Sequence, residues 1–554
     1  MSWIRASSCA LLLLAACTAP DERGPRREAH GHERPVYGGT FVYADDDDIR
    51  TLDPAIGYDS TSWTAMYLVF ETLLDYDDDM ELYGRLAERW EVDENVWTFH
   101  LRRGVEFHNG REMTADDVVA SWSRLLDPSV GSPGADFFDV IVGARAVLDG
   151  RAERPSGLVA LDRYTVRVEL EHPDPTFANM VAMNFGAIYP VEEVAKRGDR
   201  WAYAPVGSGP FAVQSWSLGE KTVFVRHEAY WDPELPYLDA VVHLAHVPRE
   251  LQFLRMEADE LHQVYRITSP DYLWLKRNPA WSANLEEVPQ VDTYGELLNV
   301  EMPPFDDVWF RRAVSTAIDR EKLARLRNGR ARPTISWVPP GLPAHVTWDD
   351  LTPEEREAYK WQRYDPELAR EALAKAGYPD GYTGPPIPYW TLTSEASLVT
   401  GLSIQQDLAE VGIPIAIHNV TFPAYLTATG RRKTVPMGYV AWVQDYPDPR
   451  NFLETKFHCD NISDENSNND AFYCNPEVDR LLDEAARELD ADRREQLYRK
   501  AQAIIAADVP FVFEYHTIAQ SLVQPYVKGF RQHPVHNRDM SRAWLDLPSG
   551  RPNP

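Results

Sequence analysis

The sequence predicts an α/β protein, and two observations lead to that class. Stretches with the two-residue alternation of strands and stretches with the helical period follow one another along all 554 residues. The composition is that of a globular protein, with 44% hydrophobic and 26% charged residues. At this length we expect about three domains. The chain has no internal repeat, and no apolar run in it is long enough to span a bilayer.

Strand patterns are spread over the first half of the chain, and helical patterns dominate the second half. The strand patterns occupy 38–44, 96–101, 222–226 and 239–247, and a helical pattern covers 60–74. Later helices are predicted directly after Asp307, over 364–376, from Asn475 with Leu489 as the last apolar position, and over 492–508. Their starts carry Asp or Asn-Pro, and Gly377 follows one of their ends, as is typical of helix caps.

The excess of acidic residues argues against two classes of binding partner. The formal net charge is −30, with 86 acidic against 56 basic residues. Phosphate backbones and anionic lipid surfaces would be repelled, so we predict no nucleic-acid partner and no membrane-surface binding. The motifs GxSxG, SxxK, HExxH and the P-loop spacing do not occur. We therefore predict no catalytic residue, cofactor or metal site, with a hydrolytic enzyme as a remote alternative.

Residues 1–17 have the features of an export signal. Arg5 precedes a short apolar run that ends at Cys17, and the run is too short to be a membrane span. The ending Leu-Ala-Ala-Cys resembles a bacterial lipobox, which implies cleavage before Cys17 and a lipid on that residue. An ordinary signal with an incidental cysteine is the alternative. Residues 18–36 are rich in proline and charge, which predicts a flexible tether. We expect an exported protein that is anchored by its lipid in the cell envelope, on the periplasmic side if there are two membranes.

Cys459 and Cys474 are the two cysteines whose thiols would remain available, because cleavage removes Cys9 and Cys17 would carry the lipid. An even number of cysteines in an oxidising compartment predicts a disulfide. The polar loop between them has no apolar periodicity, so we interpret the bond as a structural staple. A redox or metal thiol pair would require a close CxxC spacing, which is absent.

One longer segment contains a motif that resembles a known family signature. Residues 97–110, WTFHLRRGVEFHNG, followed by TADDV at 114–118, resemble the signature of the family 5 extracellular solute-binding proteins. These are peptide- and nickel-binding receptors of ABC importers. Weaker matches follow the same order over about 38–545, among them LDP at 52–54, GSGPF at 207–211, PFDDV at 304–308, DYPDP at 445–449 and NPEVD at 475–479.

The resemblance implies a two-lobed, periplasmic-binding-protein-like clamshell (type II, cluster C-like) with an inserted subdomain. Lobe I would comprise 37–85, 201–287 and 517–554, the inserted subdomain 86–200, and lobe II 288–516. A monomer of this kind would capture an oligopeptide between its lobes and deliver it to a membrane permease. Nickel, a metallophore and oligosaccharides, whose rings stack on aromatic side chains, are alternative ligands within the same family.

The resemblance also implies ligand-binding residues. Trp442-Val443-Gln444-Asp445-Tyr446 matches the pattern Trp-x-x-Asp-Tyr of the peptide-binding branch, in which the aspartate binds the free α-amino group of the peptide. Trp442 would then be an apolar wall beside a ligand side chain, with Val443 and Tyr446 next to it. Gly57, Tyr58 and Asp59 correspond to a loop that lines the cleft from the other lobe. Two alternatives stay open: Asp445 merely caps the turn 445–449, and the loop faces solvent.

One departure from the family pattern concerns the ligand carboxylate. Dipeptide receptors have an arginine for it just before the helix that begins here near Gly401, but residues 393–399 contain no base. A buried carboxylate without a cation is costly, so longer peptides whose carboxylates reach solvent fit better than dipeptides. Arg431, Arg432 and Lys433 could supply the charge, or they could form a solvated turn.

Overall fold

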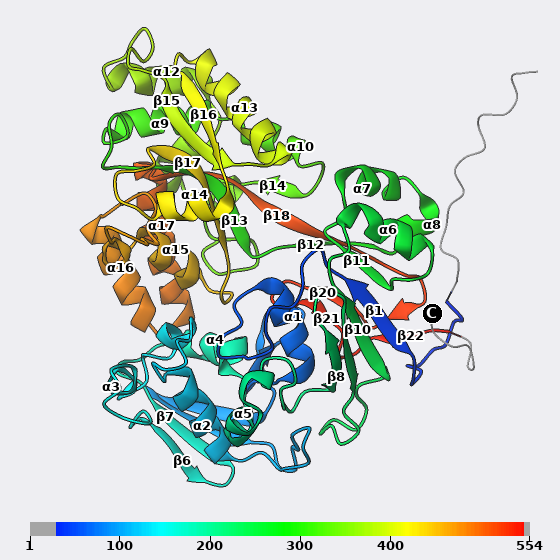
Figure 1. Cartoon of the computed structure of the whole chain (residues 1–554). Coiled ribbons are helices and arrows are strands. Elements are labelled where there is room, and N and C mark those ends of the chain that lie inside the picture. Colours follow the sequence, from blue (N-terminus) through cyan, green and yellow to red (C-terminus); the bar gives the residue numbers. More distant parts are fainter. Residues whose placement is uncertain (1–28, 548–554) are drawn as a thin grey trace, which may run out of the picture.

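The computed structural model describes residues 29–547, and two lobes share one continuous sheet (Figure 1). The sheet has 12 strands in the order β16-β15-β17-β13-β18-β11-β1-β10-β9-β8, and β12 and β14 also pair with β18. The strands on the lobe I side are β1 (Thr40–Ala44), β8 (Phe211–Ser217), β9 (Lys221–Arg226), β10 (Ala240–Leu244) and β11 (Gln263–Tyr265). Those on the lobe II side are β13 (Asp292–Leu298), β15 (Ile387–Leu392), β16 (Ile415–Val420) and β17 (Met437–Val443). The α/β class predicted from the sequence is confirmed.

The lobes are connected twice, by the strand β18 and by the segment that runs from β12 to β13, and the two connections pair with each other. The 13-residue strand β18 (Phe511–Val523) passes from lobe II into lobe I. On one of its edges, β13 pairs with its first half and β12 (Leu285–Pro289) with its second half. Because the pairing partner changes near Gln290, whose N–H donates to the carbonyl of Thr517 at 2.9 Å, we propose lobe boundaries close to 287–288 and 516–517.

The segment 86–200 forms a second sheet of four strands. Its order is β4-β5-β7-β6, from β4 (Ala87–Asp93), β5 (Val96–Leu101), β6 (Leu158–Asp162) and β7 (Thr165–Glu169). Helices α2 (Ala115–Leu125), α4 (Phe177–Ala182) and α5 (Val191–Arg197) accompany it. Buried side chains of this segment, such as Trp122, belong to the same hydrophobic core as Phe41 and Tyr526 of lobe I. The inserted segment therefore packs as an extension of lobe I.

Most predicted helices are present, with two corrections. Helices α9 (Val308–Ala317), α12 (Pro366–Lys375), α16 (Pro476–Arg487) and α17 (Ala491–Asp508) confirm the later patterns. The pattern at 60–74 was expected to be one helix, but α1 (Ser60–Val69) ends earlier, because the Val69 carbonyl accepts the Gly209 N–H and the chain turns into β2 (Leu74–Tyr76). Leu489 lies beyond the end of α16 and is 52% exposed, so it is not a core position.

The segment 29–36, expected as part of a flexible tether, contacts the C-terminal part of lobe I. The Asp546 carboxylate accepts the Gly31 N–H at 2.8 Å and the His32 N–H at 3.1 Å, and it lies 2.6 Å from His32 Nδ1. An aspartate distant in sequence thus holds residues 31 and 32, while the flexible tether over 18–36 stays a prediction. The export signal and Cys17 lie outside the described residues. None of the helices in 29–547 is long and apolar enough to cross a membrane.

Candidate functional site

Asp445 lies just beyond the end of β17, at the junction of the two lobes. Val443 pairs with Asp292 of β13, so the end of β17 is fixed against the crossing strands. Alternation along β17 places Tyr439, Ala441 and Val443 on one face and Trp442 on the other. Val443 is 60% exposed and Trp442 packs against the core of lobe II. The Val443 side chain is thus exposed at the junction, whereas Trp442, expected as an apolar wall beside the ligand, packs behind the strand.

The Asp445 carboxylate has partners from both lobes. Its Oδ1 accepts a hydrogen bond from the Tyr58 hydroxyl of lobe I, and its Oδ2 accepts one from Asn451 Nδ2 at 2.9 Å. The Asp445 N–H donates to Asn451 Oδ1 at 2.9 Å. Burial raises the pKa of Asp445 above its ordinary range, and the hydrogen bonds from Tyr58 and Asn451 oppose that rise. Two residues predicted for the ligand site from opposite lobes are therefore in direct contact.

Capping does not account for Asp445. The residue that caps α15 (Pro449–Phe457) is Asp448, whose Oδ1 accepts the Arg450 N–H at 2.8 Å. Asn451, on the same helix, also accepts from Trp442 Nε1 at 3.1 Å. One buried amide thus fixes Trp442 and Asp445 together, and it leaves Asp445 Oδ1 directed at the other lobe.

The loop that carries Tyr58 is shaped by its neighbours. Gly57 is buried, and a Cβ there would collide with the Met66 side chain. Its carbonyl accepts from Trp63 Nε1 at 2.7 Å. Asp59 caps α1 by accepting the Ser62 N–H at 2.9 Å, so its carboxylate has a structural role. Of the three predicted residues, Tyr58 presents a side chain to the site, and it is 49% exposed.

Tyr446 does not face the Val443 side. Its side chain is 5% exposed and belongs to the hydrophobic core of lobe I, where its ring lies 6.2 Å from that of Phe137. The residue that follows Asp445 therefore anchors lobe II on the inserted segment.

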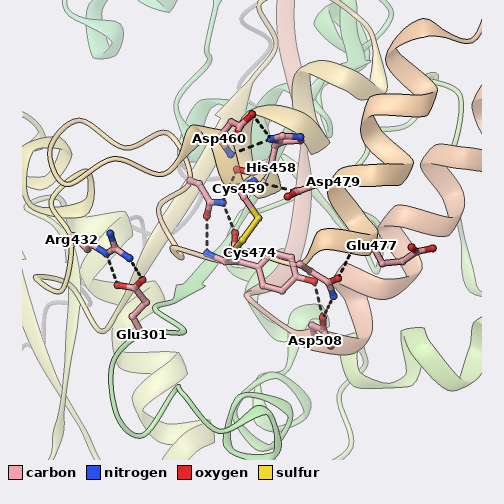
Figure 2. The surroundings of a disulfide bond; sticks show 12 residues. Glu301, Arg432, His458, Cys459, Asp460, Cys474, Glu477, Asp479 and Asp508 are labelled. Carbon is pink, nitrogen blue, oxygen red and sulfur yellow. Dashed lines mark hydrogen bonds and ion pairs between the residues drawn. A yellow bond between two sulfur atoms is a disulfide. The ribbon is translucent and has the colours of Figure 1, made fainter.

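The basic run after α14 (Phe422–Thr429) is exposed and paired with acids. Arg431 lies 3.0 Å from Glu465, and Arg432 lies 2.5 Å from Glu301 and 3.3 Å from Asp464. Figure 2 shows the Arg432–Glu301 pair near the disulfide. This pairing matches the solvated-turn interpretation of the run.

The predicted disulfide between Cys459 and Cys474 is present (Figure 2). The Cys459 N–H donates to Asp479 at 3.1 Å, which ties the bond to the first turns of α16. In the part of the chain that the structure describes, these three residues form the one cluster with metal-ligand geometry. Because both sulfurs are in the disulfide, they are not free thiolates for a metal.

Comparison with known proteins identifies the family. Residues 81–464 match "Bacterial extracellular solute-binding proteins, family 5 Middle". The chain belongs to this family. It is 28% identical to the periplasmic oligopeptide-binding protein OppA of Salmonella typhimurium, over 89% of each chain. It superposes with a TM-score of 0.74 on DppA of Helicobacter pylori in complex with the peptide STSA, at 27% identity over 92% of this chain and 99% of the other. The fold also matches clavulanic acid biosynthesis oligopeptide binding protein 2, with a TM-score of 0.83 over 92% and 96% of the two chains at 24% identity.

This solute-binding protein also has an ion pair between its lobes that sequence reasoning missed. Arg450 of α15 donates to Asp174 of the inserted segment at 2.6 Å and to Thr176 at 3.1 Å. Asp174 is fully buried. Arg450 also pairs with Glu454 on its own helix at 2.6 Å. Neither sequence position carried a motif, because a pair separated by more than 270 positions leaves no local signal.

Proposed function

We propose that this solute-binding protein binds oligopeptides between its lobes as a monomer and delivers them to the permease of an ABC importer. The observation that carries the proposal is the Asp445 carboxylate. Asn451 holds one of its oxygens, and the other oxygen faces the opposite lobe. An α-ammonium group of a peptide suits that oxygen, since a charge-assisted hydrogen bond is strong where water is partly excluded.

The electrostatics of Asp445 support a cationic ligand group. In the described part of the chain, no Lys or Arg nitrogen is paired with this carboxylate, and its closest donors are the neutral Tyr58 hydroxyl and Asn451 amide. Burial raises its pKa. The Lys456 charge opposes that rise, but Lys456 is itself paired with Asp470 at 2.7 Å. A ligand ammonium would stabilise the ionised carboxylate further, so binding energy would come from a charge that has no cation in direct contact in the free protein.

Calorimetric titration with a tetrapeptide and its N-acetylated form tests the proposal. Asp445→Asn should weaken binding of the free peptide by roughly 1–3 kcal/mol, and acetylation should weaken binding to the unaltered protein by a similar amount. Asp464→Asn, an exposed acid in the same lobe, is the control and should leave both affinities unchanged. Equal affinities for free and acetylated peptide would contradict the role of Asp445.

Export and anchoring form the second part of the proposal. Residues 1–16 would be removed, and the lipid on Cys17 would keep the receptor close to its permease. The extracellular character of the family supports this arrangement. Cys17→Ser should give an uncleaved or freely soluble protein in cell fractionation, and a mature, membrane-bound variant would contradict it.

A further inference from the structure

Three arginines lie where the lobes meet, along the edge of β18 that is opposite the edge paired with β12 and β13. Arg266 follows β11 of lobe I, and Arg327 and Arg330 lie between α10 (Arg320–Leu326) and β14 (Ala331–Pro333) of lobe II. Strand β14 pairs with β18 at 515–517, and β11 pairs with it at 521–523, on the edge opposite β13 and β12. The Ile518 N–H donates to the Arg330 carbonyl at 3.0 Å. The register therefore places Arg330 and Arg266 next to one another along this edge.

These arginines have neutral partners. Arg327 donates to the Thr400 hydroxyl at 3.3 Å, and its guanidinium lies 5.0 Å from the centre of the Tyr515 ring. Arg330 donates to the Ser269 hydroxyl of the other lobe. Arg266 lies 5.3 Å from the centre of the Tyr265 ring.

The lack of acidic partners is informative in a chain with a net charge of −30. Within the described residues, none of these arginines has a carboxylate at ion-pair distance, whereas Arg325 on the adjacent helix α10 pairs with Asp319 at 3.7 Å. Burial lowers the pKa of Arg330, and the neighbouring Arg327 charge lowers it further. Like charges gathered at one place in an acidic protein indicate a site that an anion completes.

The acids whose charge acts on this cluster are either paired elsewhere or deeply buried. Asp45 of lobe I acts on Arg266, but it is itself paired with Arg538 at 2.9 Å. Glu296 and Glu514 are buried, and burial is the chief cause that raises the pKa of both, that of Glu514 to about 7. Together they do not carry two full negative charges at neutral pH.

Arg266 itself has a φ of 56°, in the left-handed region that non-glycine residues rarely adopt, as is typical of ligand-binding positions.

We propose that Arg266, Arg327 and Arg330 bind a carboxylate of the ligand, one arginine from lobe I and two from lobe II. The inference rests on the proposed peptide-binding function and specifies its substrate class. It supplies the cation that is missing from 393–399, and it uses groups that come together from both lobes.

The sheet gives an estimate of ligand length. The order β17-β13-β18, with β14 beyond β18, puts three inter-strand steps between the Asp445 strand and the arginines. At about 4.8 Å per step this is roughly 14 Å. An extended peptide covers about 3.3–3.6 Å per residue, so about four residues join the two sites. A dipeptide is too short to reach both.

The test uses peptides of two to six residues, each as the free acid and as the C-terminal amide, titrated calorimetrically into the exported protein. Amidation of a tetrapeptide should weaken binding about tenfold, as expected for loss of a charge-assisted contact, and amidation of a dipeptide should have little effect. In Arg327→Gln and Arg266→Gln, acid and amide should bind alike. Arg325→Gln is the matched control and should keep the tenfold difference. Thermal unfolding of each variant checks that it is folded.

Further outcomes separate this inference from the proposed function. If no peptide binds, both fail. If N-acetylation weakens binding but amidation has no effect at any length, the peptide function stands and the arginine site is refuted. An amidated tetrapeptide with an acidic side chain at its last position distinguishes the source of the carboxylate. Restored affinity would show that a side-chain carboxylate is accepted, and affinity that stays low would assign the site to the terminal carboxylate.

Discussion

The Tyr58 hydroxyl of one lobe donates a hydrogen bond to the Asp445 carboxylate of the other. Asp445 Oδ2 is held within its own lobe by Asn451 at 2.9 Å, so Oδ1 is the atom that reaches across. A neutral donor thus lies where we propose that a ligand ammonium binds. The free protein can hold its lobes together at this point, and a peptide must displace or join the tyrosine.

Tyr58→Phe removes that donor and tests the relationship. We expect the free protein to become more open, seen as a larger radius of gyration by small-angle X-ray scattering. Peptide affinity should change by less than about threefold, because the ammonium replaces the contact that is lost. A loss as large as that of Asp445→Asn would show instead that Tyr58 itself binds the ligand. Tyr203→Phe, at another exposed tyrosine of lobe I, is the control.

The Arg450–Asp174 pair should stabilise contact between lobe II and the inserted segment. Removing one partner of a buried pair leaves the other charge uncompensated, so Asp174→Asn and Arg450→Gln should each lower the free energy of unfolding by about 3 kcal/mol. The double variant should lose less than the sum, because the two groups interact directly. Arg480→Gln, in an exposed pair on α16, should cost less than about 1 kcal/mol. Additive losses in urea unfolding would contradict the coupling.

The disulfide should contribute to stability and leave ligand binding unchanged. Closing a loop of this size, with a sequence separation of 15, is worth about 3 kcal/mol in the chain-entropy view. Cys459→Ser with Cys474→Ser should therefore lower the unfolding free energy by about that amount. Calorimetric titration should show unchanged peptide affinity, since Cys459 follows the C-terminal end of α15 whereas Asp445 precedes its N-terminal end. A large loss of affinity in a folded double variant would refute this separation.

Asp292 gives a pH dependence whose sign can be worked out. Burial raises its pKa from 3.8 to about 6, although Thr517 donates to it. The folded state therefore binds a proton more tightly than the unfolded state, and stability falls as pH rises from about 4 to about 6. Asp292→Asn should flatten the unfolding free energy between these pH values. An unchanged slope in urea titrations at pH 4, 5, 6 and 7 would contradict the assignment.

Local signals in the sequence predicted part of this structure well. Helix starts at Asp307 and Asn475 and the strand at 96–101 follow from capping and alternation, which depend on near neighbours. The pattern Trp-x-x-Asp-Tyr located Asp445 between the lobes. Tyr446, which we expected at the ligand site, packs against the other lobe, because its ring contacts Phe137 of the inserted segment, which is distant in sequence.

The arginines were missed for the same reason. Arg266 and Arg330 are distant in sequence and are brought together by their shared partner strand β18. No periodicity or motif reports such a pairing. Sequence patterns thus indicated which elements form, while the partners across the lobes depended on the topology of the sheet.

Native mass spectrometry of the protein, purified without denaturation from its exported form, tests the central claim most directly. We predict adducts that fragment as peptides, with masses centred on about four residues as the spacing between Asp445 and the arginines implies. Adducts of this kind should be lost from Asp445→Asn. A single metal, metallophore or sugar mass on the unaltered protein would contradict the peptide account.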